Sequence, residues 1–362
     1  MERRGLRTAG GSGGAAPTLR AAVGVPPFAD PAPFRWQDGE RTIVFGADAL
    51  ARAGEDLGEG YALLTTERAA RTAPEVLQRA GRVHHIRPGR VDEIAAELRA
   101  EVRGELLVAL GGGRVIDTAK ALAAAAGEGG GPAPRVAAIP TTLSGAEMTA
   151  VHRQAAGVGA GAPRVRPALV LSDPARSASQ PEAELAASAL NALGHAAEAP
   201  LTPLSNPVST LTALAAARRL VGALAPEGAP RRDELALGAL LAGYAIDSAG
   251  YGLHHVLSQT LARLAGMSHG QANAAMLPHT LRALADRFPA PIARFGEAIG
   301  GDPSEICARL AARAGAMSLR ALGVSSEDLD RCAREAARRP ELALTPPAAD
   351  RAELRALYEA AW

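Results

Sequence analysis

Six short apolar runs alternate with helix-like segments between residues 41 and 173, and this alternation constrains the fold more than any other feature. The runs have the length of buried strands; they are Thr42–Phe45, Tyr61–Thr65, Arg82–Ile86, Leu106–Leu110, Val136–Ile139 and Ala168–Leu171. We expect helices between them, near 48–57, 68–80, 91–103 and 115–126. Strands that alternate with helices predict a mostly parallel α/β sheet covered on both faces.

The pattern changes after Ser179. Pro181 suits the start of a helix, and Glu182 and Glu184 suit a first turn near the positive end of the helix dipole. Segments rich in alanine and leucine then follow almost to Trp362, without a strand pattern. The second part of the chain is therefore predicted to be all-helical.

Composition excludes several classes of protein. The net charge is +1 and aromatic residues make up only 3%. We therefore expect no surface that binds nucleic acid or an anionic membrane. No apolar run is long enough to cross a bilayer. The first 25 or so residues lack the apolar stretch of a secretion signal and are interpreted as a tail. The two cysteines, Cys307 and Cys332, have no metal-type spacing, which favours a reduced, cytoplasmic protein.

A glycine turn follows the fourth apolar run. Gly111, Gly112 and Gly113 come after Leu106–Leu110, and an amphipathic helix opens next. A strand, a glycine turn and a helix N-terminus expose backbone N–H groups to an anion, so this turn is a candidate phosphate site. The same segment holds Lys120, the only lysine in the chain. A compact ammonium differs from a guanidinium, which suggests a special task for Lys120; a surface lysine beside a plain turn is the alternative.

Two further strand ends carry polar groups. The segment Ile139–Thr149 offers the hydroxyls of Thr141 and Thr142 near the glycine turn, and Ser144 with Glu147 fits a capping box at a helix start. The strand Tyr61–Thr65 is followed by Glu67. A carboxylate there can accept a hydrogen bond from a ribose 2′-hydroxyl and repels a 2′-phosphate, although a solvated first-turn glutamate is the alternative.

Five of the eight histidines form an informative set: His195, His254, His255, His269 and His279. Asn191 and His195 are four residues apart, as are His255 and Gln259, so each pair shares a helix face. Three imidazoles with an asparagine oxygen could surround Zn²⁺ or Fe²⁺, although asparagine is a weaker ligand than a carboxylate. A hydrogen-bonded internal histidine is the alternative for each one.

Four ordered motifs together resemble the iron-containing alcohol dehydrogenase superfamily. They are Gly-Gly-Gly-Arg-Val-Ile-Asp-Thr-Ala-Lys-Ala (111–121), Ile-Pro-Thr-Thr-Leu-Ser-Gly-Ala-Glu-Met-Thr (139–149), Asn-Ala-Leu-Gly-His-Ala-Ala-Glu-Ala (191–199) and Ser-His-Gly-Gln-Ala-Asn-Ala-Ala-Met-Leu-Pro-His (268–279). Within the superfamily the chain is most similar to maleylacetate reductases. This resemblance implies a dehydroquinate synthase-like fold: a Rossmann-like dinucleotide-binding domain at 31–177 and an all-helical substrate and metal-site domain at 178–362, after a disordered tail at 1–30.

The resemblance also implies roles for single residues. The nicotinamide cofactor's pyrophosphate is expected at Gly112, Gly113 and Arg114, with Thr141 and Thr142 beside it and Asp117 on the nicotinamide side. We include Glu67, Gly111, Lys120 and Ser144 among the cofactor-binding candidates. His195, His255 and His269 fall at metal-ligand positions together with Asn191, where iron-dependent members have aspartate. The catalytic candidates are His255, His195, His269 and Gln259.

Two residues depart from the family pattern. Arg114 replaces a usual serine and could reach a 2′-phosphate, which would favour NADP. The carboxylate of Glu67 would repel that phosphate directly, so we expect NAD rather than NADP. Gln259 replaces a histidine and cannot supply a proton, and Asn191 leaves it open whether Fe or Zn is bound. If no metal binds, His255 is the expected partner of the substrate oxygen.

The expected activity is hydride transfer between nicotinamide and a carbonyl or secondary-alcohol carbon of a small-molecule or peptide substrate. The first hypothesis is a maleylacetate-type reductase, which acts on the C=C or C=O bond of a 2-ene or keto acid. The second is a dehydrogenase resembling those of daptide pathways, which would oxidise a threonine side chain of a ribosomal peptide, followed by loss of CO₂. A non-catalytic scaffold member is a third. A homodimer is expected by resemblance.

Overall fold

Seven strands form one sheet in the computed structural model, which describes residues 32–362 except 52, 129, 131, 160 and 225–227. The expected tail at 1–30 lies outside the described residues. The strands are β1 (Phe34–Asp38), β2 (Arg41–Phe45), β3 (Tyr61–Thr65), β4 (Ala80–His85), β5 (Leu106–Gly111), β6 (Arg135–Pro140) and β7 (Leu169–Ser172). Their order is β1-β2-β7-β6-β5-β3-β4. Only β1 runs antiparallel to its neighbour, so the predicted parallel sheet is confirmed.

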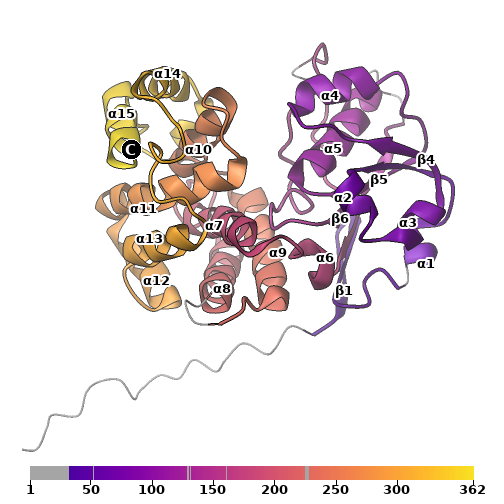
Figure 1. Ribbon diagram of the computed structural model, residues 1–362, viewed down its shortest axis with the longest axis horizontal. Coiled ribbons are helices and arrows are strands. Elements are labelled where there is room, and N and C mark those ends of the chain that lie inside the picture. Colours follow the sequence, from indigo (N-terminus) through magenta and orange to yellow (C-terminus); the bar gives the residue numbers. More distant parts are fainter. Residues whose placement is uncertain (1–31, 52, 129, 131, 160, 225–227) are drawn as a thin grey trace, which may run out of the picture. The chain divides into compact units, whose positions relative to one another are not determined.

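Helices cover both faces of the sheet, which explains why its central strands are apolar along their whole length (Figure 1). The helices of this part are α1 (Ala53–Leu57), α2 (Glu67–Ala70), α3 (Pro74–Gln78), α4 (Val91–Leu98), α5 (Gly113–Gly127) and α6 (Pro174–Ser177). On one face α4 and α5 pack on Leu64 and Leu107; on the other, α1 and α3 pack on Leu63 and Val108.

The prediction for this part differs from the structure at one helix and at one strand. The helix expected over 68–80 is divided into α2 and α3, because Pro74 starts a new helix at its first position. The strand β1 was not predicted at all: its side chains are mostly solvent-exposed, so it lacks an apolar run. β1 and β2 form a hairpin in which Asp38 pairs with Arg41 across Gly39, whose φ is +59°.

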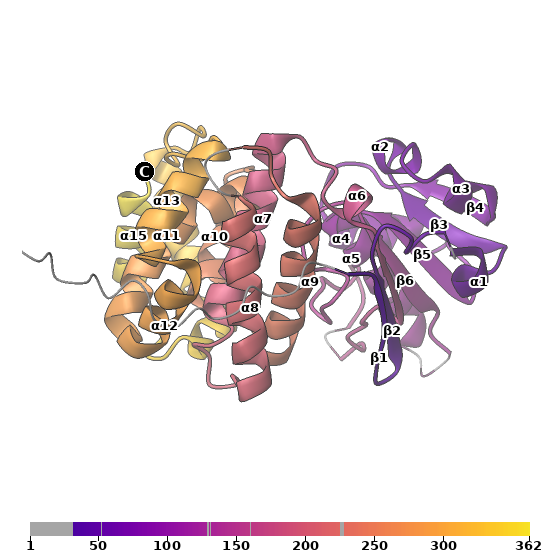
Figure 2. The same cartoon turned by 90° about the horizontal axis from the view of Figure 1, so that it is seen from below.

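The remainder of the chain is helical, as predicted. It contains α7 (Glu182–Glu198), α8 (Pro207–Ala223), α9 (Arg232–Ala249), α10 (Leu253–Leu264), α11 (His269–Arg287), α12 (Pro289–Ile299), α13 (Pro303–Arg313), α14 (Ser326–Ala336), the 3₁₀ helix η1 (Pro340–Leu344) and α15 (Arg351–Ala360). In Figure 2, α7, α8 and α9 lie side by side as long helices. Among the described residues, no helix combines the length and apolarity that a membrane span requires.

The loop that follows β6 joins the α/β part to the helical part. The Leu143 N–H donates to Ser188 Oγ of α7 at 3.0 Å, and the Ala150 N–H donates to Asp247 Oδ1 of α9 at 2.6 Å. Gly145 lies so close to α9 that a Cβ atom there would be 3.2 Å from the Cα of Gly243. This loop therefore holds the carboxyl end of β6 against α7 and α9.

Candidate functional site

The turn between β5 and α5 presents bare backbone to solvent. Gly112 is the N-cap of α5, and the first turn of this helix contains no acidic residue. A Cβ atom at Gly112 would lie 2.9 Å from Thr142 Cγ2, and the Thr141 N–H donates to the Gly111 carbonyl oxygen at 3.0 Å. The glycines and both threonines thus meet, as predicted, in a place where N–H groups of a helix N-terminus can bind an anion.

Arg114 and Asp117 lie on the accessible side of α5. Arg114 is exposed, and Asp117 has a side chain that is 29% exposed. Ser144 also lies at the turn, since a Cβ atom at Gly113 would be 3.1 Å from the Cβ of Ser144. These residues stay candidates for cofactor contact.

The prediction that Lys120 contacts the cofactor is wrong. Its side chain is completely buried, and its ammonium donates to Asp117 Oδ1 at 2.8 Å, to the Ala146 carbonyl at 3.0 Å and to the Val151 carbonyl at 2.8 Å. An ammonium has three N–H groups, so all are used inside the protein. Lys120 instead fastens α5 to the loop after β6, a geometry of three separate acceptors that a planar guanidinium does not match.

The predicted capping box at Ser144 and Glu147 is also wrong. No helix begins there; residues 144–148 form a turn in which Gly145 has a φ of +72°. Glu147 points inward and is buried, and its Oε2 has no hydrogen-bond partner among the described residues. Burial raises the pKa of this carboxyl to about 7.

Glu67 lies beside the glycine turn in the sheet. β3 pairs with β5 so that Thr65 stands opposite Leu110, one residue before Gly111. Thr66 then caps α2, and Glu67 follows in its first turn with an exposed side chain. This position fits a carboxylate that meets the ribose of a dinucleotide bound at the turn.

Three imidazoles gather between α7 and α10. The rings of His195 and His255 stack with centroids 4.5 Å apart, and the ring of His254 meets that of His255 edge-on at 4.9 Å. His254 turns away to the core, where its Nδ1 lies 3.0 Å from Thr280 Oγ1. His255 Nδ1 lies 2.6 Å from Glu198 Oε2, and both side chains are only 2% exposed. The carboxylate therefore fixes the orientation of the His255 ring.

Burial governs the protonation of this cluster. It lowers the pKa of His254 and of His255 to about 3 and holds the pKa of His195 well below its usual range, with further lowering by the neighbouring imidazoles. Burial also raises the pKa of Glu198. The imidazoles are thus neutral near pH 7, and the buried atoms His255 Nε2 and His195 Nδ1 have no partner among the described residues.

His269, the third histidine predicted at a metal-ligand position, lies on a different helix from His195 and His255. It begins α11, with Ser268 as the N-cap. Burial lowers its pKa, and the negative charge of Asp117 partly offsets the effect. The charge of His269 in turn acts on His195 and His255. Its position at the amino end of α11 leaves the residue accessible to solvent.

A path of contacts joins the turn to the imidazoles. The Asn191 side-chain amide donates to the Ser144 carbonyl oxygen at 3.5 Å, and a Cβ atom at Gly145 would lie 3.5 Å from His195 Cε1. The structure thus brings the glycine turn and the histidines to one place, as the sequence predicts.

The donor atoms meet the needs of a metal ion only in part. Buried and unpartnered in the described structure are Asn191 Oδ1, His195 Nδ1 and His255 Nε2, all neutral groups. Among the described residues, no three or more His, Cys, Asp or Glu side chains are placed to hold a metal together, so His269 does not complete the set. Without a carboxylate or a third imidazole, the described side chains do not fit the usual ligand set of Fe²⁺ or Zn²⁺.

Gln259 follows His255 by one turn on the same side of α10. Its Oε1 accepts a hydrogen bond from Arg339 Nη2 at 3.0 Å. The same nitrogen donates to the Tyr251 hydroxyl at 3.2 Å, and the Tyr251 ring lies 5.8 Å from that of His255. Gln259 is therefore a fixed neighbour of the imidazole rather than a proton carrier.

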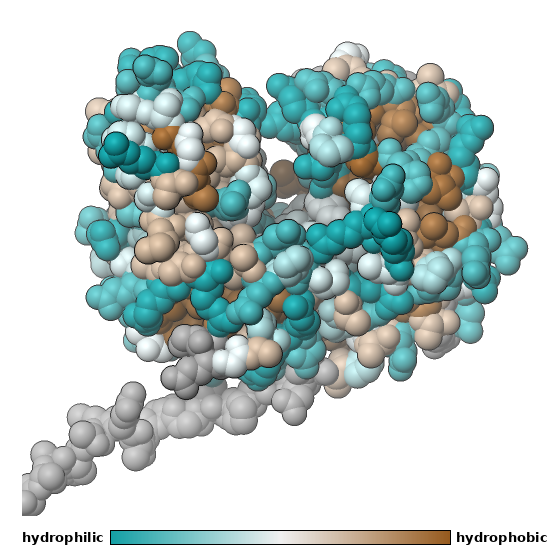
Figure 3. Space-filling model, in the orientation of Figure 1, coloured by the Kyte–Doolittle hydropathy of each residue, from teal (hydrophilic) through white to brown (hydrophobic). Residues whose placement is uncertain are grey.

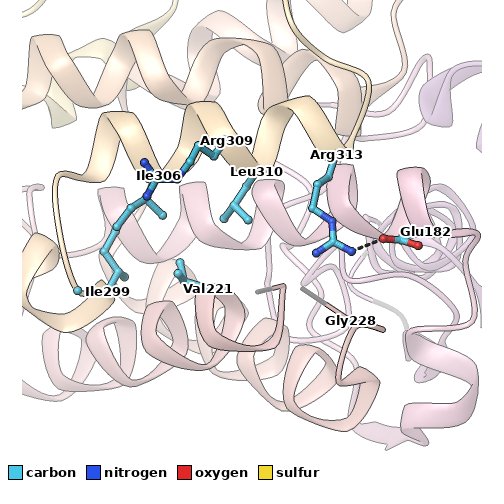
Figure 4. Close-up of a pocket in the computed structure, with 9 residues that line it drawn as sticks. Glu182, Val221, Gly228, Ile299, Ile306, Arg309, Leu310 and Arg313 are labelled. Atoms are coloured by element: carbon cyan, nitrogen blue, oxygen red, sulfur yellow. Dashed lines mark hydrogen bonds and ion pairs between the residues drawn. The ribbon is translucent and has the colours of Figure 1, made fainter. Parts of the chain in front are cut away.

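A separate cavity of about 440 Å³ lies elsewhere in the helical part (Figure 4). Val221, Ile299, Ile306 and Leu310 line it, and Glu182 forms an ion pair with Arg313 at its edge. Glu182 and Asn191 are nine residues apart on α7, about 13 Å along the helix. This cavity contains no candidate site residue.

Sequence reasoning missed three residues of the site: Glu198, Tyr251 and Arg339. Glu198 had a signal, because it follows His195 by three residues on one helix and so shares its face. Tyr251 comes four residues before His255. Arg339 had no signal, because it reaches Gln259 from 80 residues away.

Comparison with known proteins finds matches to one enzyme family for both the α/β part and the helical part. Residues 40–174 match the model of iron-containing alcohol dehydrogenase, and residues 185–362 match that of the C-terminal part of the Fe-containing alcohol dehydrogenase family. Maleylacetate reductase of Sphingobium indicum is 31% identical over 86% of this chain and 91% of its own; that of Rhizobium sp. is 30% identical over 91% and 98%. The crystal structure of maleylacetate reductase from Agrobacterium tumefaciens aligns with a TM-score of 0.74 at 28% identity, covering 91% of this chain and 97% of that one.

Proposed function

The chain belongs to the iron-containing alcohol dehydrogenase family and is an NAD(P)-dependent oxidoreductase, and on that basis we propose that it interconverts a carbonyl and a secondary alcohol in a small oxo or hydroxy acid, as a maleylacetate-type reductase. The observation that carries this proposal is the meeting of the glycine turn and the buried imidazoles through Ser144, Gly145 and Asn191. The nicotinamide, when bound, supplies or accepts the hydride.

The α5 turn suits the diphosphate of the dinucleotide. The N–H groups of Gly113 and Arg114 open the helix, and neither donates to another described residue. The helix dipole adds to the positive charge of Arg114 there. Thr142 lies against Gly112, so its hydroxyl borders the same space.

We assign the cofactor as NAD. Glu67 is exposed at the end of β3, next to the strand that carries the glycine turn. Its carboxylate accepts a hydrogen bond from a 2′-hydroxyl and repels a 2′-phosphate. Arg114 lies at the end of the turn that faces the diphosphate. Its guanidinium therefore binds phosphates that NAD and NADP share, and does not distinguish the two cofactors.

His255 and Glu198 manage the proton of the substrate oxygen. With Glu198 ionised, His255 Nδ1–H donates to it, and Nε2 offers a lone pair that can accept the proton of a substrate hydroxyl. With the proton on Glu198, the carboxyl donates to Nδ1, and Nε2–H can donate to a carbonyl oxygen. Burial raises the pKa of Glu198 and lowers that of His255, so the imidazole is neutral in both arrangements and each serves one direction of the reaction.

The family implies a divalent metal, typically iron, besides the nicotinamide. The described residues do not form its usual ligand set, so the proposed reaction does not use it. His195 and Asn191 then act as buried walls of the substrate space.

The test is transfer of deuterium from NADH labelled at C4 to maleylacetate. We expect deuterium on the former carbonyl carbon or on its conjugated position, oxidation of one NADH per turnover, and activity that survives dialysis against a chelator. An enzyme that binds NADH but transfers no deuterium to maleylacetate or to simple oxo acids contradicts the proposal. A stoichiometric ion whose removal abolishes activity contradicts the metal-free assignment.

Gln259 favours a second candidate function. It stands where a proton-transferring histidine is expected from the resemblance, and Arg339 holds it in place. This departure suits another substrate, the C-terminal threonine of a ribosomal peptide, whose side-chain alcohol would be oxidised to a β-keto acid that loses CO₂. Turnover of such a peptide with NAD, without turnover of maleylacetate, would select this candidate.

A further inference from the structure

The helix α10, which carries His255, has no capping side chain of its own. Its N-cap is Gly252, which offers no side-chain acceptor. The first N–H of the helix, that of Leu253, donates instead to Thr345 Oγ1 at 2.9 Å. The first N–H groups of a helix find no acceptor within it, so a buried hydroxyl from 92 residues further along the chain takes the place of a local cap.

The next two N–H groups of α10 share their acceptor with the imidazole. The His254 N–H donates to Glu198 Oε1 at 2.7 Å, and the His255 N–H donates to Glu198 Oε2 at 3.3 Å. The same Oε2 lies 2.6 Å from His255 Nδ1. The carboxylate is therefore bound to the start of the helix and to the ring at once. A shift of the helix start would change the hydrogen bond between Glu198 and the imidazole.

Residues 339–345, here called the capping segment, bring Thr345 to this place. The segment follows α14, over which Figure 3 shows mostly hydrophilic side chains, and then turns inward, so that Thr345 is only 3% exposed. The Thr345 N–H donates to the Leu342 carbonyl at 3.0 Å, and its carbonyl accepts from Arg287 Nη1 at 3.3 Å. A Cβ atom at position 252 would overlap Thr345 Oγ1, so the approach of the hydroxyl requires Gly252.

The capping segment contacts the neighbourhood of the imidazole at two further points. The Tyr251 hydroxyl donates to Glu341 Oε1 at 3.1 Å, and the Tyr251 ring lies 5.8 Å from the ring of His255. Arg339 Nη2 donates to Gln259 Oε1 at 3.0 Å, one helical turn after His255. Both ends of the segment thus contact residues on either side of His255 in the sequence.

We propose that Thr345 is a positioning residue: by capping α10, it holds His255 Nδ1 within hydrogen-bond distance of Glu198. This inference rests on the proposed function, because it concerns the same imidazole, and it adds a residue that touches neither substrate nor cofactor. Without the hydroxyl, the buried Leu253 N–H has no acceptor unless the helix start moves. Such a movement displaces the ring from the carboxylate.

Thr345→Val tests the capping role, because valine has nearly the shape of threonine without the hydroxyl. Thr202→Val is the matched control. Thr202 is also buried, its hydroxyl donates to the Ala249 carbonyl at 2.6 Å, and it accepts from the Leu204 N–H at 3.2 Å. Each variant thus leaves one N–H group without its acceptor close to the turn between α9 and α10, but only Thr345→Val removes a partner of α10. Thr345→Ser keeps the hydroxyl and is expected to behave as wild type.

The first measurement needs no turnover. NMR of the full-length protein with ¹⁵N-labelled histidine follows the His255 Nδ1–H proton, which a short bond to a buried carboxylate moves downfield and protects from exchange. Its signal is identified by its loss in His255→Gln. We expect Thr345→Val to move the signal upfield and to raise its exchange rate about tenfold, the factor that loss of one helix cap produces in a local opening equilibrium.

Thr202→Val and Thr345→Ser are expected to keep the wild-type signal. Absence of the signal from wild type, an unchanged signal in Thr345→Val, or equal changes in Thr345→Val and Thr202→Val overturns the proposal. If Thr345→Val does not fold, Thr345→Cys replaces it, because a thiol is a weaker acceptor than a hydroxyl and is expected to give an intermediate exchange rate.

The second measurement separates positioning from cofactor binding. In Thr345→Val, kcat with maleylacetate is expected to fall about tenfold or more, because the imidazole is misplaced, while the dissociation constant of NADH stays unchanged. Thr202→Val is expected to keep the wild-type kcat. Equal kcat in Thr345→Val and wild type overturns the positioning role and leaves the proposed function intact. If wild type reduces no ketone while the NMR signal changes in Thr345→Val alone, the proposed function fails and the cap stands.

Discussion

The proposed mechanism depends on the proton that Glu198 shares with His255. Glu198→Gln keeps the size of the side chain and an acceptor oxygen, but removes the carboxylate that takes up the proton from His255 Nδ1. We expect kcat to fall by about 100-fold or more, the usual contribution of general acid–base catalysis, with little change in the dissociation constant of NADH. Steady-state kinetics with maleylacetate measure the first quantity and fluorescence titration the second.

Thr280→Val is the matched control for Glu198→Gln. Thr280 Oγ1 contacts the neighbouring imidazole, His254, in the same buried cluster. If the two variants lower kcat equally, the effect is one of packing, and the role of Glu198 and His255 in proton transfer is rejected.

Cofactor choice also belongs to a single residue. Glu67→Ala removes the carboxylate at the end of β3, so we expect NAD binding to weaken and NADP binding to strengthen, shifting the affinity ratio about tenfold toward NADP. Glu59→Ala, at the other end of the same strand, is the control because its exposed side chain pairs only with Arg79 at 3.4 Å. Titration of both cofactors provides the measurement, and an unchanged ratio in Glu67→Ala speaks against a ribose contact.

Among the elements, α5 and the loop after β6 depend on Lys120. Its three hydrogen bonds tie the helix to the Ala146 and Val151 carbonyls inside the protein. Lys120→Met leaves those carbonyls and Asp117 without their partner, so we expect the free energy of unfolding to fall by about 3 kcal/mol and the affinity for NADH to fall with it. Urea denaturation checks the first effect. Arg135→Met, an exposed cation on β6, serves as the reference, and equal stability of the two variants contradicts an anchoring role.

Elements with a strong local pattern could be predicted, and those that depend on distant contacts could not. The buried strands and α5 follow from apolar runs and a glycine turn. The segment 139–149 was predicted to start a helix, yet Gly145 adopts a left-handed conformation because α9 and His195 pack against it. Similarly, β1 is an exposed edge strand and owes its existence to pairing with β2.

The whole molecule is expected to lose stability in acid because it buries neutral histidines. At His152, Nδ1–H donates to the Arg153 carbonyl oxygen at 3.0 Å, and Nε2 accepts from the Val165 N–H at 3.1 Å, so a second proton would break one bond. Burial lowers the His152 pKa to about 4. The unfolded chain binds this proton near pH 6.5, so stability is present above that pH and declines as the pH falls from 6.5 toward 4.

His152→Gln measures this contribution. The drop in the free energy of unfolding between pH 7 and pH 5 should be smaller than in the wild type by about 2 kcal/mol, from a shift of about 1.4 kcal/mol per pH unit. His85→Gln, at an exposed position of β4, is the control and should keep the wild-type drop. An identical pH dependence in His152→Gln and wild type would contradict the assignment.

At the scale of the molecule, the site is assembled from both parts of the chain, and the sequence predicted that assembly better than its details. Gly112, Thr142, His195 and His255 could be named because each lies in a local motif. Arg339 could not, because its contact with Gln259 spans 80 residues of sequence. Lys120 was noticed for its rarity, but its burial and its three partners depend on the fold.

The most direct measurement of the central claim, that a dinucleotide's diphosphate binds at the α5 turn, is NADH titration of Arg114→Glu. A glutamate in the first turn, which now has no acidic residue, suits the helix dipole by about 0.3–1 kcal/mol, so the fold is retained while the charge opposes the phosphates. Arg135→Glu makes the same charge change at the amino end of β6, far along the strand from the turn. The account predicts a dissociation constant raised about tenfold or more in Arg114→Glu alone, with unchanged thermal stability. Equal NADH affinity in Arg114→Glu, Arg135→Glu and wild type would contradict it.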